Sequence, residues 1–187
     1  MVAAAGPKTR LGAVSVLLVA FLAGLLLAGC GSNPENTFKV DEGEPMKLGE
    51  LVYNVQISRF LNLNDDEDKA YLVGQPPPPN NRFYLGVFMQ VSNDGKAAEQ
   101  VPTDFRIEDT VGTKFKPVSS KSLFALSLGG SVPPDGQLPK AETTAANGPI
   151  QGSMVLFLVD RAALEDRPLI LHIPAPSGPG GQVELDI

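Results

Sequence analysis

The stretch Phe83-Tyr84-Leu85-Gly86-Val87-Phe88-Met89-Gln90-Val91 decides the expected fold of this chain. Every second residue from its first to its last is apolar, which places five apolar side chains on one face of an extended strand. The same alternation recurs in residues 53–57, 101–107 and 183–187. A period of two over several residues is typical of strands with one dry face and one wet face.

Turn signals separate these segments. Asn93-Asp94-Gly95 and Asn147-Gly148-Pro149 combine residues that favour tight turns. Gly and Pro supply 19 and 17 of the 187 residues and only 19% of residues are charged, which excludes a coiled coil and a highly charged disordered chain. Seven or eight short strands without a long helix predict an all-β fold, an immunoglobulin-like β-sandwich over residues 46–187. Four side chains are expected to point inward between two sheets: Val87, Phe105, Val155 and Phe157.

Two segments are apolar at consecutive positions rather than alternately. Residues 154–159 and 169–171 contain almost no polar side chain. Strands of this kind are buried on both faces. We therefore expect both segments at central positions in their sheets.

The first 29 residues have the composition of a secretory leader. Lys8 and Arg10 are followed by 17 residues without a charged side chain. The run ends in Leu27-Ala28-Gly29-Cys30, which resembles the lipobox of bacterial lipoproteins. The resemblance implies that a signal peptidase recognises Leu27, Ala28 and Gly29, that residues 1–29 form the cleaved signal helix, and that Cys30 carries a covalent diacylglycerol. The alternative is an uncleaved anchor helix, for which 17 residues are at the short limit.

Cleavage and lipidation would place the mature chain at the cell membrane, lipid-anchored and facing outside the cytoplasm. Removing residues 1–29 takes away two basic residues and no acidic residue, so the formal net charge changes from −6 to −8. We do not expect a chain this acidic to bind nucleic acid. Residues 30–45 are predicted to be the lipidated Cys and a flexible tether. The alternative is that residues 37–40 pair as an edge strand.

The strand segments resemble the bacterial secreted immunoglobulin-like domains grouped as the domain-of-unknown-function 4352 family. The resemblance lies in residues 83–91 with Asn93 and Gly95, and in residues 105–109 with Gly112. It continues in residues 152–157 and 167–173. The resemblance implies an immunoglobulin-like sandwich outside the cytoplasm and brings no agreed catalytic residues. Two stretches are longer than a minimal domain needs, residues 62–81 and 119–140.

The loop over residues 62–81 is the predicted partner-binding surface. Loops of this length inside a compact domain are generally functional or disordered. Its acidic side chains would steer a basic partner, and its four consecutive prolines would stiffen it. The predicted partner-binding residues are Asp65, Asp66, Glu67, Asp68 and Tyr71. The alternative is that residues 71–73 fold back as a lid on the edge of the sandwich.

A weak calcium site is the second alternative for this loop. Side-chain oxygens recur there at every second residue, as they do in calcium-binding loops. The turn glycine of an EF-hand is absent, because Glu67 occupies its place. The candidate calcium ligands are Asn62, Asn64, Asp66 and Asp68.

The sequence favours a binding role over catalysis. His172 is the only histidine, and no Gly-x-Ser-x-Gly nucleophile motif occurs. We therefore expect a non-catalytic lipoprotein that needs no cofactor. Its expected partners are the lipid bilayer, through the acyl anchor, and an envelope or extracellular protein. The alternative function is a metal- or small-ligand-binding lipoprotein.

Overall fold

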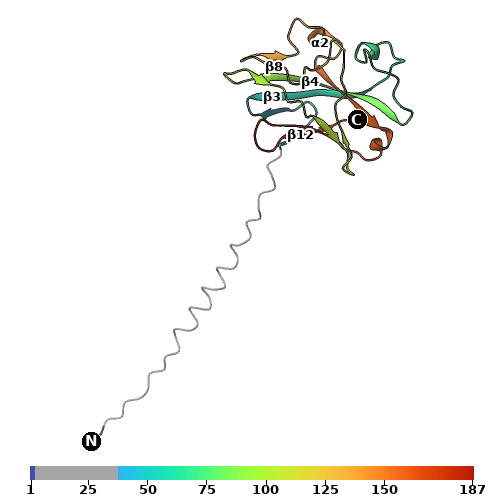
Figure 1. The fold of residues 1–187 in the computed structure, drawn as a ribbon. Helices are drawn as coiled ribbons and strands as arrows, with labels where there is room; N and C mark the ends of the chain where they lie inside the picture. Colours follow the sequence, from blue (N-terminus) through green and yellow to red (C-terminus); the bar gives the residue numbers. More distant parts are fainter. Residues whose placement is uncertain (3–37) are drawn as a thin grey trace. The chain divides into compact units, whose positions relative to one another are not determined.

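The predicted immunoglobulin-like β-sandwich is confirmed by a computed structural model (Figure 1). The structure describes residues 1–2 and 38–187, so the predicted signal helix and the lipobox, with Leu27, Ala28, Gly29 and Cys30, lie outside the described residues. Within them there are twelve strands, of which seven have four residues or more. No helix in the described part of the chain is long and apolar enough to cross a membrane.

The first sheet has five strands. In order across the sheet they are β1 (Phe38–Asp41), β12 (Gly181–Leu185), β11 (Leu169–Ile173), β6 (Arg106–Glu108) and β7 (Lys114–Phe115). β1 pairs with β12 in parallel, and the other neighbours are antiparallel. The apolar segment over residues 169–171 therefore lies centrally, as predicted.

The second sheet is antiparallel. Its strands are β10 (Ser153–Asp160), β4 (Arg82–Asn93), β3 (Leu51–Leu61) and β2 (Pro45–Leu48), in that order, and β9 (Gln137–Leu138) also pairs with β4. The prediction of a central position is wrong for residues 154–159, because β10 lies at the end of this order. Its apolar side chains are nevertheless buried, since loops cover the outer face of the sheet, as described below.

Short elements complete the part of the chain that the structure describes. β5 (Glu99–Gln100) and β8 (Ser131–Val132) form a separate two-stranded sheet. Three single-turn helices lie in connections: η2 (Asp68–Ala70), α2 (Thr144–Asn147) and η3 (Arg161–Leu164).

β1 lies inside the segment that we expected to be a tether. Phe38–Asp41 pairs with Gly181–Glu184, and Val40 packs against the core. The predicted tether over residues 30–45 is therefore wrong from residue 38 onward, and the alternative of an edge strand describes this part better. The sandwich begins at residue 38 rather than at residue 46.

The main core lies between the two sheets. All four side chains that we expected to point inward are buried there: Val87, Phe105, Val155 and Phe157. Residues from β3, β4 and β10 face residues from β11 and β12 across this layer. Non-polar burial of this kind is the dominant favourable contribution to folding.

A β-bulge in β3 changes which residues face the main core. The register between β3 and β4 shifts between Val55 and Ile57, so Gln56 is an extra residue. Val55 is buried in the main core, whereas Ile57 pairs with Phe88 on the other face and is partly exposed. The alternation expected over residues 53–57 therefore ends at the bulge.

A second hydrophobic cluster, the lid core, covers the outer face of the second sheet. It joins residues of β3, β4 and β10 to residues of two long loops and to Ala145 of α2. These loops are the two stretches that exceed a minimal domain. The lid core consists of Leu61, Tyr71, Leu72, Tyr84, Phe88, Phe124, Ala145, Met154 and Leu156.

Candidate functional site

The buried carboxylate of Asp68 organises the acidic loop. Asp68 is only 2% exposed. Its carboxylate accepts a hydrogen bond of 2.5 Å from the Arg59 guanidinium and one of 2.8 Å from the Asn62 N–H. A buried carboxylate needs such partners, because an unpaired charge there would be costly. Asp68 therefore fixes the loop and is not available on a partner-binding surface, which corrects the prediction for this residue.

Three of the four residues proposed as calcium ligands, Asn62, Asp66 and Asp68, already use a side-chain oxygen in hydrogen bonds or ion pairs with the protein. Asn62 Oδ1 accepts a hydrogen bond of 3.0 Å from the Asn64 N–H, and Asp66 Oδ1 lies 2.5 Å from Lys69 Nζ. In the described residues no group of three or more His, Cys, Asp or Glu side chains is arranged to hold a metal ion. The structure thus does not gather Asn62, Asn64, Asp66 and Asp68 into a calcium site.

Tyr71 belongs to the lid core rather than to a free surface. Its ring makes edge-to-face contacts with Phe88 and Phe124, and burial raises the pKa of its hydroxyl. The prediction that Tyr71 contacts a partner is therefore wrong, and the alternative of a lid is correct for Tyr71 and Leu72, both of which are buried. Asp65, Asp66 and Glu67 are exposed, and their role in partner binding stays a prediction.

The proline run is attached to β4 at both ends. The Tyr84 hydroxyl donates a hydrogen bond of 2.9 Å to the Pro76 carbonyl, and the Arg82 N–H donates one of 2.9 Å to the Pro79 carbonyl. Gln75 also donates to the Ser119 carbonyl at 2.7 Å, which joins the two long loops. The prolines therefore hold the lid against the sheet.

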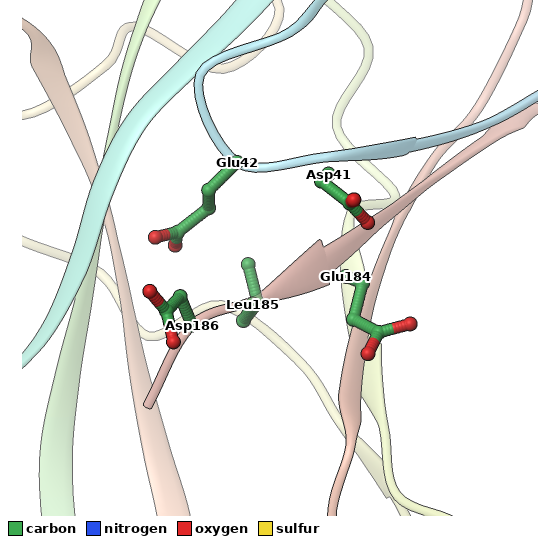
Figure 2. A pocket seen from close by; sticks show the side chains of 5 residues that line it. All are labelled: Asp41, Glu42, Glu184, Leu185 and Asp186. Carbon is green, nitrogen blue, oxygen red and sulfur yellow. The ribbon is translucent and has the colours of Figure 1, made fainter.

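An acidic cleft of about 300 Å³ lies where β1 and β12 end. Figure 2 shows the Glu42 and Asp186 carboxylates on one side of it, with Glu184 turned the other way. Glu184 is paired with Lys39 at 2.8 Å. Burial raises the pKa of the Glu42 carboxyl, and the nearby charge of Asp186 raises it further. The residues lining the cleft are Asp41, Glu42, Glu184, Leu185 and Asp186.

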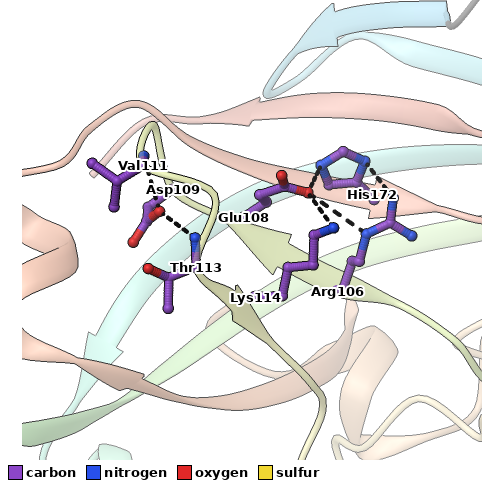
Figure 3. A network of polar contacts seen from close by, with 7 residues as sticks. All are labelled: Arg106, Glu108, Asp109, Val111, Thr113, Lys114 and His172. Atoms are coloured by element: carbon purple, nitrogen blue, oxygen red, sulfur yellow. Dashed lines mark hydrogen bonds and ion pairs between the residues drawn. The ribbon is translucent and has the colours of Figure 1, made fainter.

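An ionic network occupies the outer face of the first sheet around His172 (Figure 3). Glu108 Oε2 lies 3.3 Å from His172 Nε2 and 3.8 Å from both Arg106 Nε and Lys114 Nζ. Burial and the Arg106 charge lower the pKa of His172, so the ring is neutral at pH 7. Both ring nitrogens have partners, since Arg106 lies 3.3 Å from Nδ1. The network joins the neighbouring strands β11, β6 and β7, so its role is to stabilise the sheet.

The largest opening among these features is a groove of about 540 Å³, a volume typical of ligand sites. One wall is formed by residues 98–103 and the other by residues 174–176. Tyr53 and Gly129 also line it. Sequence reasoning missed this groove, because its walls come from segments more than 70 residues apart and neither segment has a motif.

Tyr53 gives the groove a polar group. The residue is 2% exposed and contacts Phe105 edge to face, with 6.3 Å between ring centroids. Burial raises the pKa of its hydroxyl, and no hydrogen bond to that hydroxyl is found within residues 38–187. In residues 38–187 the buried side-chain atoms without a partner belong to Glu42, Asn54, Ser58 and Arg106, so the Tyr53 hydroxyl is not closed off in the core but reaches the groove. The groove therefore offers an unused hydrogen-bonding group to a ligand.

No family model and no curated protein matches the sequence. Solved structures do. An uncharacterised β-sandwich protein of Clostridium difficile 630 aligns with a TM-score of 0.50 and 11% identity, over 83% of this chain and 99% of its own. A protein of unknown function from Listeria monocytogenes EGD-e aligns with a TM-score of 0.50 and 11% identity, over 84% and 89%. A secreted protein of Mycobacterium tuberculosis has a TM-score of 0.49 and 11% identity, over 82% and 99%. The first two likenesses show that the chain shares a β-sandwich fold with proteins whose functions are themselves unassigned.

Proposed function

We propose that the protein is a lipid-anchored, extracytoplasmic binding module that catalyses no reaction. The observation that carries this proposal is the lipobox-like Leu27-Ala28-Gly29-Cys30 placed shortly before the sandwich. The first strand begins at Phe38, so only seven residues separate it from Cys30. Seven residues span at most about 25 Å. Lipidation of Cys30 would therefore keep the start of the sandwich close to the bilayer surface.

A binding role fits the chemistry of the described residues. The single histidine is neutral and held between Arg106 and Glu108, where its nitrogens serve a cross-strand network. The groove beside Tyr53 supplies a cavity of ligand size and a free hydroxyl. Kinship with the domain-of-unknown-function 4352 family is part of this proposal. The partner would be an envelope or extracellular protein.

The anchor is tested on the full chain expressed in a bacterium. Mass spectrometry of the membrane fraction should find that residues 1–29 are absent and that Cys30 carries a diacylglycerol. The matched control is Cys30→Ser, which replaces one sulfur by oxygen and should abolish both processing and membrane retention. An intact Met1 in membrane-extracted wild type, or full recovery of the wild type in the aqueous fraction, would contradict the proposal.

A small-molecule ligand is the second candidate function. The volume of the groove favours it, since sites for small ligands fall in the same range. The metal-binding form of this alternative has no comparable support, because the acidic loop uses its oxygens internally. The two candidates differ in what the wall over residues 98–103 would contact.

A further inference from the structure

One side of strand β5 has no strand partner in the described part of the chain. β5 pairs with β8 in a two-stranded sheet. Val101, which follows β5, forms two hydrogen bonds of 2.9 Å with Gly129 and Gly130, on the β8 side. Peptide groups alternate in direction along a strand, so the N–H and C=O of Gln100 point to the opposite side. Gln100, in the two-residue strand β5, thus presents an open strand edge within residues 38–187.

The groove runs along this open edge. All six residues of 98–103 line it, whereas no residue of β8 does. The facing wall, Pro174-Ala175-Pro176, contains two residues without a backbone N–H and cannot form a regular ladder with β5. The edge therefore stays open within the protein, with room beside it.

Two side chains of the groove indicate the character of an occupant. The Tyr53 hydroxyl reaches the groove and has no hydrogen-bond partner within residues 38–187. Glu99 is the only charged residue among those that line the groove, and it forms no ion pair with any residue that the structure describes. A single unpaired carboxylate beside an open strand edge favours a positively charged ligand.

We propose that the groove binds an extended peptide segment with a basic side chain, whose backbone pairs with the N–H and C=O of Gln100. The Tyr53 hydroxyl contacts the bound segment from the floor, and Glu99 pairs with its basic side chain. Addition of a strand to an open sheet edge is a recurring mode of peptide recognition, in which the backbone supplies affinity and side-chain contacts supply selectivity. This inference rests on the proposed binding role and names the class of partner.

The chemistry of the wall distinguishes a peptide from a small molecule. A small apolar ligand would use the proline rings and leave the Gln100 backbone without a partner. An extended peptide provides a donor and an acceptor at the spacing that the strand edge requires. A second copy of this chain that pairs along the same edge would also form hydrogen bonds with the Gln100 backbone. Such a complex would be detected as a dimer.

The test measures peptide binding to the full chain purified in detergent. The probe is a fluorescently labelled six-residue peptide of alternating lysine and valine, followed by anisotropy. Two comparison peptides have glutamate in place of lysine, or N-methyl groups on the amides of one edge. We expect the lysine peptide to bind and the other two to bind at least tenfold more weakly. Amide exchange of Gln100 should slow only with the lysine peptide.

Two variants assign the contacts to the groove. Glu99→Gln should weaken binding of the lysine peptide about threefold to tenfold, and Tyr53→Phe should weaken it about threefold, both without a change in melting temperature. Glu165→Gln is the matched control, because Glu165 is exposed and lies outside the groove, and it should bind like the wild type.

Several outcomes would overturn the inference. They are absence of binding at millimolar peptide, equal binding of the glutamate or N-methylated peptide, equal affinity of the Glu99→Gln variant, or a concentration-dependent dimer that excludes the peptide. Acylation of Cys30 is measured in a separate experiment. If Cys30 carries no acyl group, the proposed function is wrong, but the peptide titration can still be interpreted. If Cys30 is acylated and the groove binds no peptide, only the peptide inference is wrong.

Discussion

Replacing Tyr71 by alanine tests whether the loop over residues 62–81 is a structural lid. Tyr71 is fully packed, with ring centroids 5.0 Å from Phe88 and 4.6 Å from Phe124. Phe88 belongs to β4, and Phe124 belongs to the other long loop. Tyr71 therefore joins both loops to the outer face of the second sheet. Removing its ring should lower the free energy of unfolding.

The expected loss is about 3–4 kcal/mol in the free energy of unfolding. Truncating a large buried aromatic residue to alanine costs about 3–5 kcal/mol, of which each edge-to-face pair contributes about 0.5–1.5 kcal/mol. The lower part of that range applies, because Tyr71 lies in a loop that can partly collapse into the space. For a domain of this size the melting temperature should fall by about 6–15 °C.

Urea unfolding of the full chain, followed by circular dichroism, measures this difference. The control is Val73→Ala in the same loop, where the side chain is 46% exposed and the change should stay within about 0.5 kcal/mol. If Tyr71→Ala unfolds at the same urea concentration as the control, the lid reasoning is refuted. Loss of a crosslinked partner without loss of stability would restore the loop as a partner-binding surface.

The remaining predictions concern the main core and the acidic cleft. Phe157→Ala should lower the free energy of unfolding by about 3–5 kcal/mol because Phe157 is completely buried, whereas Leu123→Ala at an exposed position should change it little; urea unfolding of both variants checks this. Glu42→Gln should raise the melting temperature at pH 7, because burial raises the pKa of Glu42 and its ionised form therefore destabilises the fold there. The gain should disappear as the pH falls below about 4, where Glu42 is protonated in both states, and a gain that persists at pH 3.5 would contradict the reasoning.

The sandwich could be predicted because its strongest signal is local. Leu85, Val87 and Met89 alternate along β4, and all three are buried in the main core. Alternation is a property of one strand, so neighbouring residues are enough to reveal it. The parallel edge strand β1 was harder to assign, because four residues of weak alternation resemble a tether.

The bulge and the sheet order could not be read in this way. Nothing in the sequence around Gln56 shows that this residue is extra, because a bulge depends on the partner strand. The residues of β10 are apolar on both faces whether their cover is a neighbouring strand or a loop. The lid supplies that cover, and its contribution arises from contacts such as that between Tyr71 and Phe88.

The candidate site, like the fold, could be predicted only where its signal is local in the sequence. The acidic loop attracted attention because its charges are adjacent in sequence, yet Asp68 turns inward to hold the loop. The groove has no such signal, since Tyr53 looks like any core residue of a strand. Its exposed hydroxyl has meaning only beside residues 98–103 and 174–176, which the fold brings together.

The lid and the groove therefore differ in how their polar groups are used. The lid loop needs Asp68, Tyr71 and the hydrogen bond to the Pro76 carbonyl, because each of them holds the loop on the sheet. The groove leaves the Tyr53 hydroxyl and the backbone of Gln100 without partners in the described residues, so both groups are free to bind a ligand. Polar groups that the fold does not use are where a binding function is best sought.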